Sequence, residues 1–376
     1  MRPHPAQAHA MRHTLDEKSY AILNSYLSTA ANFIVWRRHH DIESTKGDPI
    51  MNEITSKYAR RLSRLGQRAV FGMAVMDAAK ENPNLMALVA DVASSAGLER
   101  MKSELPGQIL DTGIAEQNMM GMAAGLASEG FEVVTATFAP FQSMRCLEQI
   151  RVNFGYMGLK VIMAGLASGV AYGELGYTHC CIEDVSIMRS IPGIAVVSPA
   201  DCVEVVKAFE AALKDETSVY IRLTGKANTP MVYTEDYDFK IGKGVILREG
   251  GDILLITNGL TVHTCLEAAD RLAGSGISAE VINMHTVKPF DSELLKSRLA
   301  GKSLVVTIEE HELIGGLGDA VAACLSELSS HPRLIRIGHP NAYGKAAHQE
   351  ALLPFYGLDA NGIIQKIVDS STSLGA

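Results

Sequence analysis

The sequence DTGIAEQNM, at residues 111–119, carries the strongest structural signal in this chain. It places Glu116 where a short apolar strand beginning at Ile109 runs into a helix over 115–128 that is rich in Gly and Ala. In α/β proteins such a loop lies at the carboxyl ends of parallel strands, where ligands bind. Glu116 also has a purely structural interpretation, because an acidic residue in the first turn stabilises a helix. From the residues alone, this helix cap is the commoner role.

Strands and helices alternate on both sides of this stretch. The first part of the chain has predicted strands over 85–90, 109–110, 132–138, 159–166, 194–197 and 218–223, and predicted helices over 67–82, 115–128, 142–154, 182–190 and 202–213. The second part has predicted strands over 253–257, 278–282, 304–308 and 334–337, and predicted helices over 261–273, 291–299, 316–328 and 360–370. Strands that alternate with helices of about 10–15 residues indicate parallel sheets covered on both faces. The sequence therefore predicts the α/β class, with two doubly wound domains.

The domain boundaries follow from breaks in this alternation. They are an N-terminal extension over 1–60, a first domain over 61–225, a linker over 226–250 and a second domain over 251–376. Residues 1–15 are polar and rich in His, and are expected to be disordered. An apolar stripe over 16–40 predicts an amphipathic helix. A membrane-surface helix is the weaker alternative, because Asp16 and Glu17 begin this segment. Residues 224–250 predict a hairpin as well as the linker.

Composition limits the classes of function. The 376 residues include 34 Lys and Arg against 42 Asp and Glu, a formal net charge of −8. This acidic balance argues against nucleic acid or an anionic membrane as the main partner. The six cysteines form no C-x-x-C pair and predict reduced thiols. No apolar run reaches the roughly 18 residues of a membrane span, so we expect a cytoplasmic protein.

Two further loops contain residues suited to a site. Phe138 and Phe141 flank a Pro in the segment TFAPF, which ends a predicted strand. Such aromatic pairs are commonly part of a core. The Gly-rich segment GELGYTH, over 173–179, contains His179, although a single loop histidine is more often a surface or packing residue.

Two motifs near the C-terminal end of the sequence predict neither a metal site nor a phosphate site. The run Glu309-Glu310-His311 has no second cluster to complete a set of metal ligands, so we expect no metal site in this chain. The segment GGLG over 315–318 lacks the spacing of a phosphate-binding loop.

Taken together and in this order, the motifs resemble the C-terminal two thirds of transketolase and of 1-deoxyxylulose-5-phosphate synthase. The resemblance extends from about Arg68 to the C-terminus. Its segments are DTGIAEQNMMGMAAGLA over 111–127, TFAPF, GELGYTH, EVINMHTVKPFD over 280–291 and VVTIEEHELIGGLGD over 305–319. It implies a pyrimidine-binding domain for thiamine diphosphate, followed by the C-terminal domain of the family.

The resemblance also implies roles for the cofactor-facing residues. Glu116 corresponds to the glutamate that donates a hydrogen bond to the aminopyrimidine ring, for which its carboxyl must be protonated near neutral pH. Phe141 corresponds to the aromatic residue that stacks on this ring, and Phe138 would line the same pocket. Asp91 and Val92 fall in the loop that faces the central bend of the cofactor.

For the substrate, the resemblance gives His179 the role of holding a sugar hydroxyl or moving a proton. Arg68, Ser95 and Arg222 correspond to residues that bind the phosphate of a sugar phosphate.

The sequence departs from transketolases at three positions, and two of these departures remove a polar contact to the substrate. Leu175 replaces an Asp that contacts a sugar hydroxyl, Tyr177 replaces a Pro, and Ala167 replaces a His. We therefore expect a different or less hydroxylated substrate than an ordinary pentose phosphate.

The family's diphosphate-binding domain, with its G-D-G…N motif, does not occur in this sequence. The resemblance therefore implies a split enzyme. A partner subunit would supply the diphosphate site and the Mg²⁺ ligands, and the two chains would form a heterotetramer. The implied reaction is transfer of a two-carbon ketol unit from a ketose or ketose phosphate to an aldehyde.

Two alternatives remain open. One is the beta subunit of another thiamine enzyme, such as a 2-oxoacid dehydrogenase or a synthase that decarboxylates pyruvate. The other is a non-catalytic regulatory subunit that kept the fold. The motifs IAEQN, GYTH and EEH are closer to those of transketolase than to those of the beta subunits. The presence of Glu116 and Phe141 argues against a regulatory role.

Overall fold

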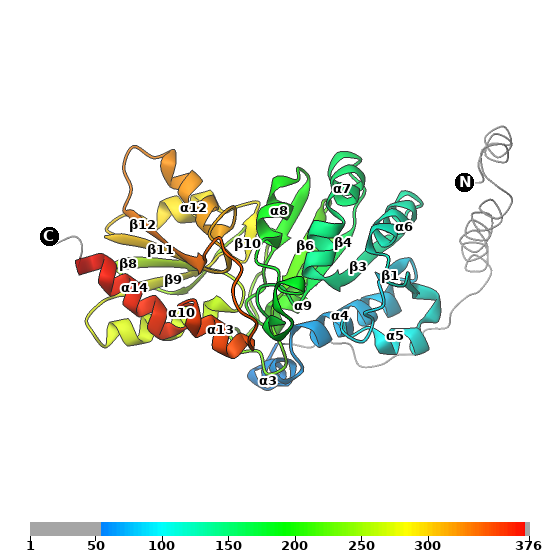
Figure 1. The fold of residues 1–376 in the computed structure, drawn as a ribbon, viewed down its shortest axis with the longest axis horizontal. Coiled ribbons are helices and arrows are strands. Elements are labelled where there is room, and N and C mark those ends of the chain that lie inside the picture. Colours follow the sequence, from blue (N-terminus) through cyan, green and yellow to red (C-terminus); the bar gives the residue numbers. More distant parts are fainter. Residues whose placement is uncertain (1–53, 373–376) are drawn as a thin grey trace, which may run out of the picture. The chain divides into compact units, whose positions relative to one another are not determined.

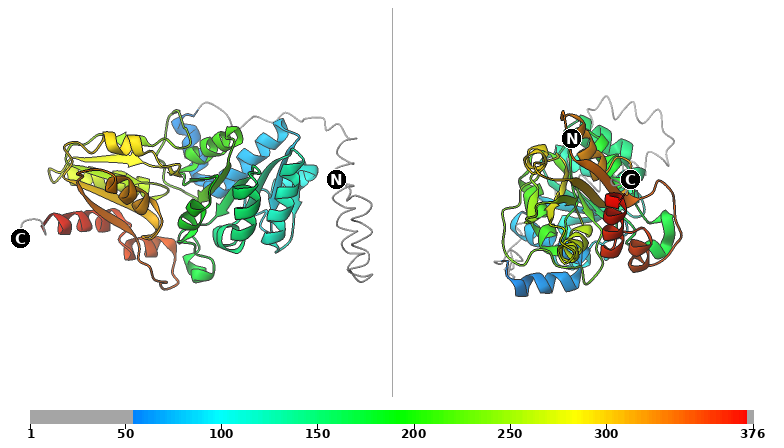
Figure 2. Two further views of the ribbon diagram at one scale, coloured as in Figure 1. Left: turned by 90° about the horizontal axis from the view of Figure 1, so that it is seen from above. Right: turned by 90° about the vertical axis from the view of Figure 1, so that its left-hand side faces the viewer.

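The computed structural model of the protein describes residues 54–372. The predicted polar segment over 1–15 and the predicted helix over 16–40 lie outside the described residues. Two sheets follow one another along the described chain, the first drawn in cyan to green and the second in yellow to orange (Figures 1 and 2). The predicted α/β class is confirmed.

The first sheet has seven strands in the order β10-β5-β6-β4-β3-β1-β2. All neighbouring strands are parallel except β10, which pairs antiparallel with β5. The strands are β1 (Leu85–Val89), β2 (Ile109–Asp111), β3 (Glu132–Phe138), β4 (Ile162–Leu166), β5 (Ile194–Val197), β6 (Ser218–Leu223) and β10 (Thr286–Lys288).

Helices cover both faces of this sheet (Figure 1). On one face α4 (Gln67–Glu81) and α9 (Cys202–Lys214) pack together over a buried core that includes Phe71 and Phe209. The other helical segments of this part are α3 (Ser56–Leu65), α5 (Glu99–Glu104), η1 (Pro106–Gln108), α6 (Glu116–Ser128), η2 (Phe141–Arg145), α7 (Leu147–Ile150), η3 (Arg151–Tyr156), η4 (Gly173–Thr178) and α8 (Asp184–Ser190). Side chains alternate along each strand, so residues next to one another on β6 face opposite helix layers.

The second sheet has five strands in the order β12-β11-β8-β9-β7, and only β7 is antiparallel to its neighbour. These strands are β7 (Val245–Arg248), β8 (Ile253–Thr257), β9 (Ala279–Asn283), β11 (Leu304–Glu312) and β12 (Arg333–His339). The helices are α10 (Thr261–Ala273), α11 (Ser292–Ser297), α12 (Leu317–Ser326), α13 (Gln349–Phe355) and α14 (Ala360–Thr372). Two buried cores form on its faces, one with α10 and α14 and the other with α11 and α12.

Three sequence-based predictions are corrected. The hairpin predicted over 224–250 is wrong, because β7 pairs with β9 as an edge strand of the second sheet. The single helix predicted over 142–154 is wrong, because η2 and η3 are π-helical and only the four residues of α7 between them are α-helical. Strand β10 was not predicted, since three residues are too few for an alternation to be recognised.

Among residues 54–372, no helix is both long and apolar enough to cross a membrane. All six cysteines are free and buried.

Candidate active site

Glu116 begins α6 and is buried, at the edge of the first sheet where β1 and β2 end. The loop before it turns at Gly113, whose φ of 67° favours glycine. Asp111, the last residue of β2, accepts hydrogen bonds from the backbone N–H groups of Asp91 (2.9 Å) and Gly113 (3.2 Å). Asp91 itself has a left-handed φ of 57°. One carboxylate therefore joins the loops that follow β1 and β2, and it places Asp91 beside the loop that leads to Glu116.

Aromatic rings gather at the ends of β3 and η4. Phe138 lies 6.3 Å from Phe141 and 6.2 Å from His179, and Phe141 lies 5.8 Å from His179, all measured between ring centroids and all edge to face. Tyr172, just before η4, adds a fourth ring 5.3 Å from Phe138. The structure thus brings three predicted residues together, and Tyr172 is an additional member that sequence reasoning missed.

Arg145 joins this cluster to Glu116. Its Nη1 lies 2.8 Å from both carboxylate oxygens of Glu116, and its guanidinium carbon lies 4.0 Å from the ring centroid of Phe141. The π-helical turn of η2 starts at Phe141 and ends at Arg145. Sequence reasoning missed Arg145, because its importance comes from a contact with Glu116, which lies 29 residues earlier in the chain.

The predicted phosphate ligands are not all brought to this place. Arg68 donates to the phenol oxygen of Tyr172 at 2.6 Å, so it borders the aromatic cluster. The loop after β1 lies against Arg68, because a Cβ at Gly97 would meet the Arg68 carbonyl oxygen at 2.8 Å. In that loop Ser95 is half-buried, and Val92 packs against the core under α4 and α9.

Arg222 is the clear correction. Its side chain is 2% exposed, and Nε lies 3.0 and 2.9 Å from the two carboxylate oxygens of Asp184. Nη2 donates to the carbonyl oxygen of Glu310 at 2.8 Å, and Tyr220 also donates to Asp184 at 2.8 Å. This guanidinium is buried in an ion pair with Asp184 and does not reach the surface. The prediction that it binds a substrate phosphate is therefore wrong.

A different cation lies where β6 leads out of the sheet. Lys226 Nζ lies 3.5 Å from the carboxylate of Glu174, two residues after Tyr172 in the chain. The backbone of Lys226 also lies against Gly66, close in sequence to Arg68, because a Cβ at Gly66 would meet its carbonyl oxygen at 2.4 Å. Arg68 therefore lies beside Tyr172, and Lys226 lies beside Glu174.

The three positions that depart from transketolases have different environments. Leu175 is 52% exposed within η4. The hydroxyl of Tyr177 lies 3.0 Å from that of Tyr356. Ala167, at the end of β4, has a left-handed φ of 52° and is buried. Of the three, Leu175 is the one that presents its side chain at the surface.

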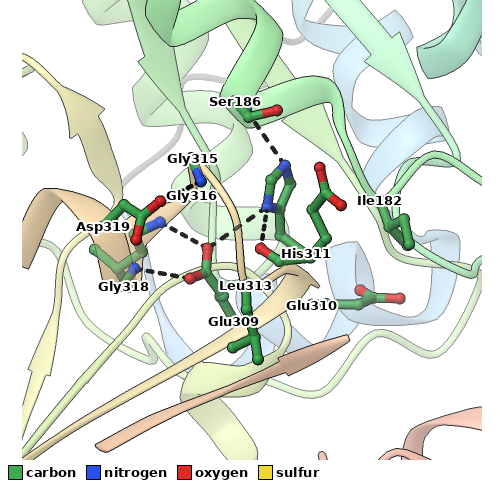
Figure 3. Close-up of polar contacts among 12 residues, drawn as sticks. Ile182, Ser186, Glu309, Glu310, His311, Leu313, Gly315, Gly316, Gly318 and Asp319 are labelled. Atoms are coloured by element: carbon green, nitrogen blue, oxygen red, sulfur yellow. Dashed lines mark hydrogen bonds and ion pairs between the residues drawn. The ribbon is translucent and has the colours of Figure 1, made fainter. Parts of the chain in front are cut away.

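Figure 3 shows the polar contacts that the late motifs make. Glu309 accepts hydrogen bonds from the N–H groups of Leu317 (2.6 Å) and Gly318 (2.7 Å), so the protein's own carboxylate fills the N-terminus of α12. Burial raises the pKa of Glu309 to about 7.

His311 has a matching structural role. Its Nε2 accepts from the N–H of Ser186 in α8 at 3.3 Å, and its Nδ1 lies 2.8 Å from the carbonyl oxygen of Glu312. Burial lowers the pKa of His311 to about 4, which keeps the imidazole neutral. Within the described part of the chain, no group of three or more His, Cys, Asp or Glu side chains is placed to hold a metal ion.

Comparison with known proteins decides the family. Residues 64–230 match the model of the transketolase pyrimidine-binding domain, and residues 242–363 match that of the transketolase C-terminal domain. The chain is 39% identical over 291 residues to the 6-deoxy-6-sulfo-D-fructose transketolase subunit SqwH of Clostridium sp. strain MSTE9, covering 77% of this chain and 90% of that subunit. The chain belongs to the transketolase family. The resemblance inferred from the motifs is confirmed.

Two further matches of this transketolase-family chain are described as a section or as a split form of transketolase. It is 37% identical over 306 residues to a putative transketolase C-terminal section of Methanocaldococcus jannaschii, covering 81% of this chain and 96% of that protein. A solved structure described as a split gene transketolase, an inactive beta4 tetramer, has a TM-score of 0.74 at 36% identity, over 82% of this chain and 98% of that one.

Proposed function

We propose that this chain is the C-terminal subunit of a thiamine-diphosphate-dependent transketolase-like enzyme. The enzyme transfers a two-carbon ketol unit from a ketose or ketose phosphate to an aldehyde. The observation that carries the proposal is that one planar group, the guanidinium of Arg145, contacts both a buried carboxylate, Glu116, and the ring of Phe141. Relatives named as transketolase subunits support the same reaction class.

The contacts of the Arg145 guanidinium indicate whether Glu116 and Phe141 could bind the aminopyrimidine ring of the cofactor. It is flat, carries N–H groups on its edge, bonds to Glu116 and covers the ring of Phe141. An aminopyrimidine is also flat, has nitrogen on its edge and stacks on aromatic rings. The two residues therefore suit the pyrimidine of thiamine diphosphate. When bound, this cofactor supplies the nucleophilic carbon on which ketol transfer depends.

Each nearby side chain then has a defined task. Glu116 holds a proton at a pyrimidine nitrogen, Phe141 stacks on the ring and Phe138 supports Phe141 from its edge. Nδ1 of His179 lies 3.0 Å from the hydroxyl of Thr178, which leaves Nε2 to hold a substrate hydroxyl or move a proton. The loop that contains Asp91 and Val92 is assigned to the middle of the cofactor.

We assign the phosphate of a phosphorylated substrate to Arg68 and Ser95, with Lys226 as the second cation in place of Arg222. The support is that Arg68 donates a hydrogen bond to Tyr172 and that Lys226 pairs with Glu174, two residues later in the chain. Arginine and lysine are both ordinary phosphate ligands, the first as a planar fork and the second as a point charge.

The remaining parts are assigned to a partner. A second chain of about 250–300 residues with a G-D-G…N motif would hold the diphosphate and Mg²⁺, since magnesium is commonly bound through few protein ligands together with substrate phosphates. In this proposal the domains span 61–225 and 251–376, two copies of each subunit form a heterotetramer, and the enzyme works in carbohydrate metabolism in the cytoplasm. Relatives that are themselves subunits support the partner.

Substrate choice is tested at Leu175. We expect Leu175→Asp to raise kcat/KM about tenfold for substrates with a hydroxyl next to the carbonyl, because the new carboxylate would accept a hydrogen bond from that hydroxyl. Kinetics with matched hydroxylated and deoxygenated aldehydes measure the ratio. Leu175→Asn, which adds a polar group without charge, is the control. An equal change for both aldehydes would show that Leu175 does not face the substrate.

The reaction class is tested with the two subunits mixed. Incubation with ketose phosphates and sulfonated ketoses as donors and with a set of aldehydes should yield ketol-transfer products. Pyruvate should not be decarboxylated at a comparable rate. Turnover of pyruvate without ketol transfer would favour a pyruvate-decarboxylating enzyme, and an absence of both reactions would favour a regulatory subunit.

A further inference from the structure

Arg145 contacts at once the two groups that the proposed function assigns to the cofactor ring. Its Nη1 lies 2.8 Å from both oxygens of Glu116, and its guanidinium carbon lies 4.0 Å from the ring centroid of Phe141. Phe138 and His179 meet the ring of Phe141 edge to face at 6.3 and 5.8 Å. The ring is thus surrounded by its two neighbours and Arg145, and an aminopyrimidine stacked on the same face would need the space of the guanidinium.

We propose that Arg145 is a latch that occupies the place of the aminopyrimidine and must leave before the cofactor ring can enter. This inference rests on the proposed function. It makes the chain self-inhibiting toward its own cofactor, with one side chain filling the carboxylate site and the stacking site together.

The two partners of the latch differ in their freedom to move. The side chain of Glu116 is 4% exposed, whereas that of Arg145 is 44% exposed. The backbone carbonyl oxygen of Arg145 accepts a hydrogen bond from Gln117 Nε2 at 3.0 Å, which holds the main chain of η2 against α6. Opening is therefore a rotation of the Arg145 side chain into solvent, with Glu116 and the backbone left in place.

The closed latch also holds Glu116 in the wrong hydrogen-bonding role. A carboxylate that accepts from a guanidinium has no proton to donate, whereas the proposed function needs Glu116 to donate to a ring nitrogen. Loss of the latch should therefore free both the space and the carboxyl group. The apparent affinity for the cofactor equals the intrinsic affinity multiplied by the fraction of molecules in which the latch is open.

The test is the affinity of Arg145 variants for thiamine diphosphate. The enzyme is assembled from the full chain and its partner subunit, and binding is measured by calorimetry in the presence of Mg²⁺. We expect Arg145→Met to bind about tenfold more tightly than the wild type, because a cation–π contact and a charge-assisted hydrogen bond no longer compete. Arg145→Gln should show the same direction, so the result does not depend on one variant folding well.

Arg151→Met is the matched control. Arg151 begins η3, six residues after Arg145, and pairs with exposed Glu148 rather than with Glu116, so its loss should leave cofactor affinity unchanged. The full chain alone, probed with thiamine by ligand-observed NMR, should show the same order of affinities, because thiamine carries the ring without the diphosphate.

The outcomes separate the latch from the proposed function. If the wild-type complex binds the cofactor and Glu116→Ala weakens binding, but Arg145→Met binds equally or more weakly than the wild type, the latch is wrong and the proposed function stands. If the wild-type complex binds no thiamine diphosphate, both are wrong.

Discussion

Replacing Glu116 by Gln is expected to lower the turnover number of the assembled enzyme about 100-fold or more, the scale of a general acid–base contribution. Gln has the shape of the carboxyl group but cannot hold and release a proton in the same way. Glu116 is buried and, within residues 54–372, its carboxylate bonds to the partly exposed Arg145, so folding and subunit assembly should be unaffected. Steady-state kinetics of the purified complex measure the effect, and its melting temperature checks the fold.

The helix-cap interpretation of Glu116 predicts a different result. Glu99 provides the matched control, because it is also an acidic first residue of a helix, α5, but is exposed. Glu99→Gln should leave turnover unchanged. If Glu116→Gln retains near-normal turnover and loses only stability, Glu116 is a cap and has no part in catalysis.

Replacing Arg222 by Ala is expected to lower the free energy of unfolding by about 3–5 kcal/mol, the usual cost of removing one partner of a buried ion pair. Asp184 would remain buried without its cation, and the carbonyl oxygen of Glu310 would lose a donor. That hydrogen bond joins β6 of the first sheet to β11 of the second, so the loss should also weaken the link between the sheets. Urea denaturation of the full chain measures the change.

Two further variants make this result specific. Arg151→Ala removes an exposed ion pair of the same type and should change stability little. Arg222→Met combined with Asp184→Leu removes both charges and should recover a large part of the lost stability. If Arg222→Ala is as stable as the wild type but selectively loses activity on phosphorylated substrates, the phosphate role first inferred for Arg222 has to be restored.

Local patterns in the sequence correctly predict most elements of both sheets, because burial on two faces gives short apolar strands and helices a recognisable spacing. The predictions that are wrong or missing concern residues that contact each other in the fold but lie far apart in the sequence. Strand β10 exists because Thr286 pairs with Val197 in another part of the chain. Arg222 is the one charged residue of β6, a strand whose residues are all buried, and its partner Asp184 lies on α8. Nothing in the spacing of β6 indicates whether such an arginine faces a ligand or an internal acid.

In the candidate site too, local motifs were predicted and contacts between distant residues were missed. The motif residues Glu116, Phe138, Phe141 and His179 were predicted, and the structure places the three rings together with Arg145 linking them to Glu116. Arg145 and Tyr172 were missed, because their importance comes from contacts with Glu116 and Arg68, 29 and 104 residues away in the chain.

The division of the cofactor site between two subunits is tested most directly by calorimetric titration of thiamine diphosphate with Mg²⁺. The ligand is titrated into the full chain alone and into an equimolar mixture with the partner subunit that carries the G-D-G…N motif. Because the chain is assigned only the pyrimidine half of the site, we expect weak or undetectable binding to the chain alone and tight binding to the mixture. Sub-micromolar, Mg²⁺-dependent binding by the chain alone would contradict the split site.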